Sequence, residues 1–493
     1  MIPETQSDVA AFLEARAGRP PIETHISAVF VGPETAWKLK KAVALPFLDF
    51  TKPARRRHFV EHEFALNHSM APGLYRAVRG IARAADGLHF CPADSPGATE
   101  WVLEMEAIPP ADFLDEIAAQ GGLTPDLCRS LGDLVARLHE AAPIARQNNA
   151  VAHMQKLVGD IMASAPRAGL AQPSLTLWHT GMQAQLQAHG ALLTARAGAG
   201  RVRRVHGDLH LGNLCLWHGS PLPFDALEFD EELATIDTGY DLAFLLMDIE
   251  QRAGRNAANA VFNRYMARTG DWGLLPLLPL FLSLRAMVRA YVGALQNKPG
   301  GGVYLEAALA YLQPALTPVI AIGGLQGTGK STLARALAPG FGPAPGALVL
   351  RSDELRKRQH HAPPETRLPQ TAYRPEANAA LNTALLQAAT EAAPSGHGLI
   401  IDASFISALL RAEMEQTIRA TGRAWLELWL EAPLPVLTDR LEKRRGDASD
   451  AGPEVLRRAA LAETGPISWH RLNAAEHDTL YNAALALCGQ PQT

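Results

Sequence analysis

The sequence lacks the features that mark several large classes of protein. Its 493 residues include only four cysteines, which are scattered and form no metal-binding or redox spacing. The longest apolar stretch, residues 274–284, is short and is interrupted by Pro276 and Pro279, so we do not expect it to span a bilayer. The formal net charge is only −4. These absences argue against a disulfide-stabilised secreted protein, a membrane protein and a general nucleic-acid binder.

The composition instead favours a globular protein of the cytoplasm. Hydrophobic residues make up 47% of the chain and charged residues 19%, which is ordinary for soluble domains. The N-terminus has no basic segment followed by an apolar one, so we expect no signal peptide. A chain of 493 residues is too long for one core, and we expect two or three domains.

The strongest motif is the stretch GGLQGTGKST at residues 323–332. From Gly324 to Ser331 it satisfies the G-x-x-x-x-G-K-[ST] pattern of a phosphate-binding loop. Residues 318–322 before it read as a buried strand, and residues 331–337 after it read as a helix whose N-terminus favours anions. We expect Lys330 to reach the β- and γ-phosphates of ATP and Ser331 to hold Mg²⁺. The residues expected to bind the nucleotide are Gly324, Gly327, Thr328, Gly329, Lys330, Ser331 and Thr332.

Two acidic residues follow the next predicted strands. Asp353 comes shortly after residues 347–350, and Asp402 ends the apolar run 399–401. Carboxyl ends of parallel strands meet at the crevice where ligands bind. We predict that Asp353 is the base for a substrate hydroxyl and that Asp402 is a carboxylate of the Mg²⁺ site. The alternative for each carboxylate is a helix cap. Arg356 is a candidate anion contact.

Basic residues occur at the end of a later predicted helix. Arg440 and Arg444 precede a polar, glycine-containing loop that runs to Asp450. This pattern is typical of a lid that closes and brings positive charge to the transferred phosphoryl group, with Arg444 as a catalytic and Arg440 as a nucleotide-binding candidate. The alternative is a solvated basic helix.

A second candidate centre lies in the first half of the chain. The stretch HGDLHLGN, residues 206–213, contains Asp208 and Asn213, and Asp225 follows about a dozen residues later. The intervening residues read as a hairpin, which would bring Asn213 and Asp225 together. Phosphoryl transfer from ATP requires such a set, with Asp208 as the base and Asn213 and Asp225 as Mg²⁺ ligands. The alternative is a pair of polar turns beside a hairpin.

This stretch resembles the H-G-D-x-x-x-x-N loop of aminoglycoside phosphotransferases and choline kinase-like enzymes. Residues from about 20 to 300 resemble the first half of bacterial proteins that join an aminoglycoside phosphotransferase-like domain to an ATP-binding domain. The resemblance implies that Lys38, or Lys40 on the same strand face, pairs with the α- and β-phosphates and that Glu63 holds this lysine by an ion pair. It also implies that residues 104–107, with Met105, form the hinge that meets adenine. No G-x-G-x-x-G loop is present between the first strands.

The second half resembles the phosphate-loop kinases that include polynucleotide kinase, gluconate kinase and chloramphenicol phosphotransferase. The resemblance is carried by residues 324–332, 352–356, 402–405 and 444–450. These enzymes transfer phosphate to hydroxyl groups, so the resemblance implies ATP and Mg²⁺ as cofactors. It also implies that residues 359–374 lie where such an enzyme recognises its substrate.

Two groups of arginines lie outside these motifs. Arg55, Arg56 and Arg57 stand near a helix start, where positive charge is electrostatically unfavourable, and we expect a solvated face or an anion contact. Arg285 and Arg289, one helical turn apart, are expected to meet a partner domain or to face water. We expect His206 and Asp241 to support the neighbouring loop.

Together these patterns predict a multidomain α/β protein. A bilobal, protein-kinase-like α+β domain is expected at residues 1–313, with a small lobe at about 20–108 and a helical large lobe at 109–313. A phosphate-loop kinase domain with a parallel sheet is expected at residues 317–493. The predicted function is ATP- and Mg²⁺-dependent transfer of phosphate to a hydroxyl of a small polar metabolite, such as a sugar, polyol or nucleoside. The alternatives are a kinase of nucleic-acid ends and a nucleotide-sensing regulator without small-molecule turnover.

Overall fold

The computed structural model describes residues 1–45, 48–145, 149–296, 301–314, 317–444 and 446–489. The chain divides into two compact units, of which the first comprises Met1–Gly122, Leu138–Asn148 and Gly200–Asp241. The second comprises Leu123–Arg137, Asn149–Ala199 and Leu242–Thr493. The second unit thus contains both helical residues before position 313 and the residues from 317 onward.

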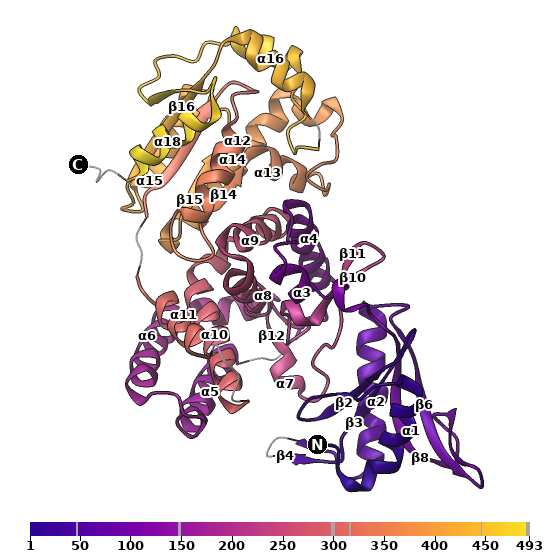
Figure 1. The fold of residues 1–493 in the computed structure, drawn as a ribbon. Coiled ribbons are helices and arrows are strands. Elements are labelled where there is room, and N and C mark those ends of the chain that lie inside the picture. The colour runs from indigo at the N-terminus through magenta and orange to yellow at the C-terminus, as the bar shows by residue number, and fades with distance from the viewer. Residues whose placement is uncertain (46–47, 146–148, 297–300, 315–316, 445, 490–493) are drawn as a thin grey trace. The chain divides into compact units, whose positions relative to one another are not determined.

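The first unit is built on an antiparallel sheet of six strands, in the order β1-β2-β3-β8-β6-β7 (Figure 1). Successive residues of β8 face opposite sides of this sheet, as the pleat requires. Val102 packs with Leu13 of α1, whereas Leu103 packs with Val60 of α2. The elements are α1 (Ser7–Ala17), β1 (Ile22–Glu23), β2 (Ser27–Val31), β3 (Thr35–Lys40), α2 (Pro53–Met70), β6 (Tyr75–Ala84), β7 (Gly87–Pro92) and β8 (Ala98–Glu106).

Short elements complete the first unit. The predicted hairpin is present: β10 (Leu214–Trp217) pairs with β11 (Ser220–Pro223) in an antiparallel register. Strand β9 (Val202–Arg204) pairs with β12 (Thr235–Asp237), a contact that the sequence did not predict because both strands are only three residues long. The remaining elements are β4 (Ala44–Leu45), β5 (Leu48–Asp49), α3 (Leu114–Ala119) and α7 (Glu231–Ala234). Helices α4 (Pro125–Ala141) and α8 (Thr238–Ala253) have residues in both units.

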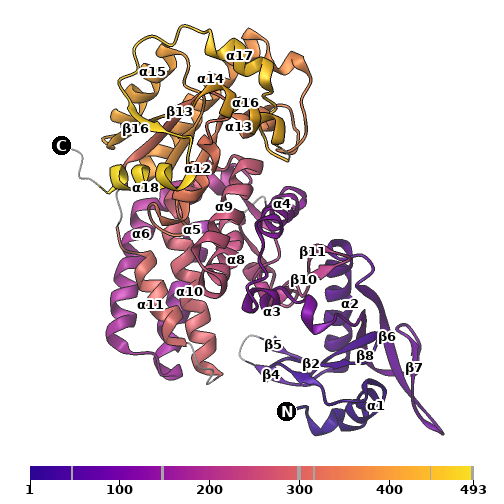
Figure 2. The ribbon, with the colours of Figure 1, turned by 45° about the horizontal axis from the view of Figure 1, so that its top comes forward.

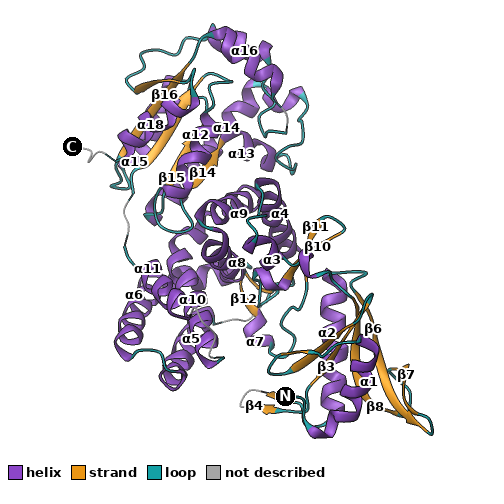
Figure 3. Ribbon diagram, viewed as in Figure 1, coloured by secondary structure: helices purple, strands orange, loops and turns teal. Residues whose placement is uncertain are grey.

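The second unit begins with a helical region, which consists of α5 (Ala150–Ser164), α6 (Gln172–Gly198), α9 (Arg255–Thr269), α10 (Leu278–Leu295) and α11 (Gly301–Tyr311) (Figure 3). Its core is dominated by α10, in which most of the first ten side chains are buried. The segment Trp272–Leu295 is long and apolar enough to cross a membrane by length and composition alone, but 72% of its apolar window is buried inside the molecule. A core helix of a soluble protein has the same properties, so the segment is weak support for a membrane span.

The part of the second unit from residue 317 onward is here called the phosphate-loop region. It contains a fully parallel sheet of five strands in the order β14-β15-β13-β16-β17 (Figure 2). Ile320 and Ile322 of β13 pack with Leu333 of α12 on one face of the sheet, and their neighbours Val319 and Ala321 are buried on the other. This arrangement confirms the predicted fold class. The elements are β13 (Val319–Gly324), α12 (Lys330–Leu337), β14 (Leu348–Arg351), α13 (Ser352–Gln359), α14 (Pro375–Ala392), β15 (Leu399–Asp402), α15 (Ala408–Arg419), β16 (Trp425–Glu431), α16 (Leu434–Lys443), α17 (Pro453–Ala460), β17 (His470–Asn473) and α18 (His477–Cys488).

Arg56 and Arg285 do not face water, which removes one of the two alternatives expected for each. Arg56 is 4% exposed, and its guanidinium pairs with Glu100 at 2.6 Å and donates to two backbone oxygens. Arg285 is 6% exposed and lies over the Phe244 ring at 4.7 Å. A helical pattern of polar residues does not reveal that a charge is buried when its partner is distant in sequence.

The Arg56–Glu100 pair joins α2 to β8, so we expect the Arg56→Leu variant to destabilise the first unit by about 3 kcal/mol, because Glu100 would be left buried and unpaired. The neighbouring Arg55 is exposed, and Arg55→Leu is the matched control with little expected effect. Urea unfolding followed by tryptophan fluorescence measures the change. Equal midpoints for the two variants would contradict a stabilising role for the pair.

Candidate active sites

The first centre is built around two lysines on one face of β3. Lys38 and Lys40 are two residues apart, so both side chains point to α2, where Glu63 lies. Lys38 Nζ donates to Glu63 Oε1 at 2.7 Å, and Lys40 Nζ lies 2.6 Å from Glu63 Oε2. The predicted ion pair of Glu63 is therefore present, but it is shared by both lysines.

Each lysine has a second acidic partner. Lys38 also pairs with Asp225, and Lys40 also pairs with Glu228. Glu228 was not singled out from the sequence, because only its spacing from Asp225 links it to this centre. Lys38 alone of the two contacts a predicted Mg²⁺ ligand, which favours it over Lys40 as the phosphate-binding lysine.

The charges of this cluster support one another. Burial opposes ionisation of Lys38, but the Asp225 and Glu63 carboxylates outweigh it and raise the pKa of Lys38 well above its ordinary value. Burial also opposes ionisation of Glu63, yet the two lysines lower its pKa to about 2. At neutral pH both lysines and Glu63 are charged.

The loop that carries Asp208 is fixed by buried hydrogen bonds. His206 Nδ1 accepts the Asp208 N–H at 3.3 Å, so Nε2 carries the proton and donates to the Phe224 carbonyl at 3.0 Å. Burial lowers the pKa of His206, which keeps the ring neutral in this role. The Gly207 N–H donates to Asp241 Oδ1 at 3.0 Å, and Gly207 has a φ of 82°, which favours glycine. His206 and Asp241 therefore hold the loop, as expected.

The hairpin brings the three predicted chemical residues of this centre to one place. The Phe224 N–H donates to the Asn213 carbonyl at 3.0 Å, a bond that joins the two ends of the hairpin. Asp225 directly follows Phe224 and therefore lies close to Asn213. Asn213 Nδ2 donates to Asp208 Oδ2 at 2.9 Å, which leaves the amide oxygen of Asn213 for another partner. The side chains of Asp208 and Asp225 are each 41% exposed. Their roles as base and metal ligand stay predictions.

The predicted adenine hinge lies at the end of β8. Met105 is opposite Ala36 of β3 and Tyr75 of β6. The Glu106 N–H donates to the Leu74 carbonyl at 2.8 Å, and the Ala107 N–H donates to the Glu34 carbonyl at 3.1 Å. Two of the backbone donors expected to meet adenine are thus used within the chain.

The second centre is the phosphate loop between β13 and α12. Gly324, Gly327 and Gly329 have φ values of 135°, 86° and 88°. A Cβ atom on Gly324 would lie 2.5 Å from the Leu430 carbonyl oxygen, so only glycine fits there. Lys330 Nζ donates to the carbonyls of Gly324 and Leu325, both at 2.9 Å, and so lies over the loop.

The ends of neighbouring parallel strands bring Ser331 and Asp402 together. Asp402 ends β15 beside Ile322 of β13, and the Ser331 hydroxyl donates to Asp402 Oδ2. A hydroxyl and a carboxylate are the oxygen donors that Mg²⁺ prefers, so these residues fit the predicted ion. Arg351 was missed from the sequence. Its guanidinium donates to Asp402 Oδ2 at 3.2 Å and to Ser331 Oγ at 3.0 Å.

Arg351 also holds the predicted lid loop. It is 4% exposed, and it pairs with Glu354 at 2.9 Å and with Asp447 at 3.1 Å. Burial opposes its charge, but Glu354, Asp402 and Asp447 outweigh this and raise the pKa of Arg351. An arginine directly after an apolar strand was the signal in the sequence that a buried acidic cluster lies nearby.

The predicted lid arginines contact backbone oxygens. Arg440 donates to the carbonyls of Ala474 and Ala475, both at 2.8 Å. Arg444 donates to the Ala451 carbonyl at 2.5 Å and is near enough to Lys330 to oppose its positive charge. Their contact with a phosphoryl group stays a prediction.

Asp353 lies in the first turn of α13, and the described residues include no hydrogen-bond partner for its carboxylate. It favours the charged form of Lys330 across the centre.

Arg356, the candidate anion contact, has other partners. It donates to the Ala372 carbonyl at 2.5 Å and to Asn378 at 2.8 Å, and it lies over the Tyr373 ring, so it shapes the predicted substrate segment.

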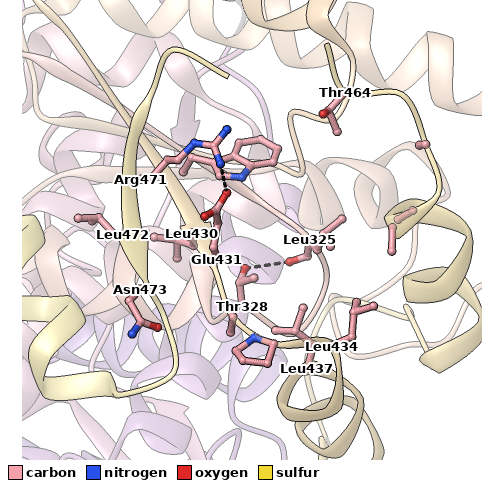
Figure 4. A pocket seen from close by; sticks show the side chains of 16 residues that line it. Leu325, Thr328, Leu430, Glu431, Leu434, Leu437, Thr464, Arg471, Leu472 and Asn473 are labelled. Atoms are coloured by element: carbon pink, nitrogen blue, oxygen red, sulfur yellow. Dashed lines mark hydrogen bonds and ion pairs between the residues drawn. The ribbon is translucent and has the colours of Figure 1, made fainter. Parts of the chain in front are cut away.

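A pocket of about 670 Å³ adjoins the phosphate loop (Figure 4). Leu325 and Thr328 of the loop lie on one side, and Glu431 at the end of β16 pairs at 2.9 Å with Arg471 of β17. Its size is in the range of small-molecule sites, and its walls are mixed apolar and polar. Further lining residues include Trp429, Leu434, Leu437 and Thr464.

The Ser331–Asp402 contact leads to a test of the metal site. We expect Ser331→Ala to weaken Mg-ATP binding on the order of 10-fold, because an oxygen donor is lost, and to leave the binding of ATP in EDTA almost unchanged. Isothermal titration with and without Mg²⁺ measures both affinities. An equal loss in EDTA would assign the serine to the nucleotide rather than to the ion.

Two parts of the chain match family models. Residues 97–277 match the phosphotransferase enzyme family, and residues 319–462 match an AAA domain. These matches confirm the resemblance predicted from the sequence, in which a phosphotransferase-like region precedes a phosphate-loop region. They support a kinase-type phosphotransferase.

Similar proteins cover one or both regions. The chain is 28% identical over 488 residues to the uncharacterised protein Rv2004c of Mycobacterium tuberculosis (strain ATCC 25618 / H37Rv), with 92% of each chain covered. A solved choline/ethanolamine kinase family protein from Mesorhizobium loti is 12% identical with a TM-score of 0.39, covering 62% of this chain and 93% of that one. A gluconokinase from Sinorhizobium meliloti 1021 is 17% identical with a TM-score of 0.25, covering 36% of this chain and 93% of that one.

Proposed function

We propose that this protein uses ATP and Mg²⁺ to transfer the γ-phosphoryl group to a hydroxyl of a small polar metabolite, such as a sugar, a polyol or a nucleoside. The observation that carries this proposal is the arrangement at the phosphate loop. Lys330, the Ser331–Asp402 pair and the carboxylate of Asp353 all lie at the carboxyl edge of one parallel sheet. Binding of Mg-ATP needs the first three, whereas transfer of the phosphoryl group to an acceptor also needs a base.

The proposed reaction uses the residues of this edge in separate roles. Asp353 accepts the proton of the acceptor hydroxyl, whose oxygen forms a bond to the γ-phosphorus while the bond from that phosphorus to the bridging oxygen breaks. ADP leaves with the bridging oxygen. Lys330 would leave the loop carbonyls that it now contacts and bind the β- and γ-phosphates. Ser331 and Asp402 would hold Mg²⁺, which when bound neutralises the charge on the phosphates.

The lid loop contributes positive charge in this proposal. Arg444 would bind the transferred phosphoryl group, and Arg440 would hold the nucleotide side of the site. Asp447 keeps the loop near the centre through Arg351. This geometry supports a lid that orders the site, because closure around a substrate excludes water and completes the set of charges.

The first centre is proposed as a second nucleotide site. Asp208 would act as base, Asn213 and Asp225 would hold Mg²⁺, Lys38 would bind phosphates under the control of Glu63, and Met105 would lie near adenine. The alternative function for this centre is a regulatory nucleotide sensor. The Lys38–Asp225 ion pair favours it, because Lys38 is paired with the carboxylate that would hold Mg²⁺. The two centres would then act in sequence or one would control the other.

We also propose the domain division and the location. The kinase-like domain comprises residues 1–313 and the phosphate-loop domain comprises residues 317–493. A cytoplasmic location is supported by Cys91, Cys128, Cys215 and Cys488, which are free thiols.

Product formation tests the proposed function directly. The full-length protein is incubated with Mg-ATP and a bacterial metabolite extract, and new phosphorylated species are followed by mass spectrometry. We expect Lys330→Ala to abolish the product, because the phosphate contacts are lost. Lys52→Ala replaces an exposed lysine and is the matched control.

The Asp208→Ala variant assigns the role of the first centre. A product that persists in Asp208→Ala but not in Lys330→Ala would place the chemistry at the phosphate loop. The loss of the product in both variants would show that the centres are coupled. The absence of any product in the wild-type protein, with ATP still bound, would overturn the metabolite-kinase proposal in favour of the nucleotide sensor.

A further inference from the structure

Strand β14 lies at the edge of the parallel sheet, and a side chain of the helical region pairs with backbone groups on its outer side. Asn263 of α9 accepts the Val349 N–H at 2.7 Å through Oδ1 and donates to the Ala347 carbonyl at 3.0 Å through Nδ2. One amide side chain thus does for β14 what the peptide group of a neighbouring strand would do. An edge strand without such cover would present unpaired backbone groups.

The same face of α9 makes further contacts with the start of β14. Asn259 is one helical turn before Asn263, is 4% exposed, and also donates to the Ala347 carbonyl at 3.0 Å. Phe262, three residues after Asn259, packs edge-on against the His397 ring, which lies 2.8 Å from the Gly346 carbonyl. Three side chains at helical spacing therefore fix the approach to β14.

Two arginine contacts attach the helical region to the elements that follow β14. Arg264 of α9 pairs with Asp133 and with Glu365, both at 2.7 Å, and Glu365 belongs to the predicted substrate segment. Arg358 of α13 lies over the Trp272 ring at 5.0 Å. The helical region thus holds β14, α13 and the substrate segment in one place.

The position of β14 determines the position of the candidate base. The strand ends at Arg351, which contacts Ser331 and Asp402, and α13 begins at the next residue with Asp353 in its first turn. Among the described residues β14 has a single strand neighbour, β15, and its other side is not paired with a strand. No residue of the phosphate loop holds this outer side of β14 in place.

We propose that Asn263 is a positioning residue for the phosphate-loop centre: by pairing with the edge of β14 it sets where Asp353 presents its carboxylate. The proposal rests on the proposed function, since it assumes that Asp353 takes the proton of the acceptor. The phosphate-loop centre then depends on a helix that lies outside the phosphate-loop region of the sequence.

The kinetic test uses Mg-ATP with water as the acceptor, because the natural acceptor is not identified. Water takes the place of the hydroxyl, and the products are ADP and phosphate. We expect Asn263→Leu to lower kcat on the order of 10-fold or more, because the base moves, and to change KM for ATP by less than about 2-fold, because β13 and the loop bind ATP. Asn256→Leu, at an exposed position of the same helix, is the matched control.

A double-mutant cycle separates positioning from general destabilisation. If Asn263 acts through Asp353, the variant carrying both Asn263→Leu and Asp353→Asn turns over no more slowly than Asp353→Asn alone. Losses that multiply, or a rise in KM that accounts for the whole effect, would overturn the proposal. Asn263→Asp keeps the acceptor for the Val349 N–H, and we expect a smaller loss of kcat from it. It carries the same test if Asn263→Leu does not fold.

Hydrogen–deuterium exchange of the full-length protein tests the contact without any activity. We expect faster exchange in peptides that contain Val349 for Asn263→Leu, and wild-type exchange in peptides of β15 and in Asn256→Leu. Unchanged exchange at Val349 would overturn the proposal. If turnover persists in Lys330→Ala, the rate does not come from this centre. The exchange result then decides the role of Asn263, and the product assay with Lys330→Ala decides the proposed function.

Discussion

The hydrogen bond between Ser331 and Asp402 is the contact on which the second half of the molecule depends. It exists because β13 and β15 are parallel neighbours whose carboxyl ends finish together, with Ile322 opposite Asp402. A parallel sheet places all such ends on one edge, where loops and helix N-termini can bind phosphate. The buried Arg351 then compensates the acidic groups at this edge and connects them to the lid loop.

The first centre is held together in a different way, by ion pairs between its elements. Its chemical residues come from an antiparallel sheet, a helix and a hairpin, and a network of five charges, of which only Asp225 is substantially exposed, holds them together. Burial of this many charges is costly, and it is tolerated because each lysine has two acidic partners and Glu63 is shared. Such a network gives a defined arrangement in the absence of ligand and must rearrange if Asp225 is to hold a metal ion.

Local patterns predicted most of the secondary structure and the motifs. The phosphate loop, the hairpin before Asp225 and the long helices follow from glycine spacing and from apolar periodicity, which depend on neighbouring residues only. The partners of buried charges were not predictable in this way. Arg56 and Glu100, or Arg351 and Asp447, are far apart in sequence, and only the folded chain brings them together. Strand β17 was missed because its residues are polar and largely exposed.

Contacts within the second unit join the helical region to the phosphate-loop region. The motifs separate a kinase-like half from a phosphate-loop half, whereas the compact second unit contains both the helical region and the phosphate-loop region. The reason is physical: the amides of Asn259 and Asn263 and the charge of Arg264 make α9 part of the support of β14. Side-chain amides that pair with a strand edge leave no periodic signal in a sequence.

The most direct measurement of the central claim is the fate of the γ-phosphoryl group. The protein is incubated with a metabolite extract and ATP that carries ¹⁸O on all oxygens of the γ-phosphate, including the bridge to the β-phosphate. Transfer to a hydroxyl predicts a metabolite that gains a phosphoryl group with three labelled oxygens, an ADP that keeps the labelled bridge, and the loss of this metabolite product in Asp353→Asn. Label found only in free phosphate, with Asp353→Asn equal to the wild-type protein, would contradict a phosphotransferase at this centre.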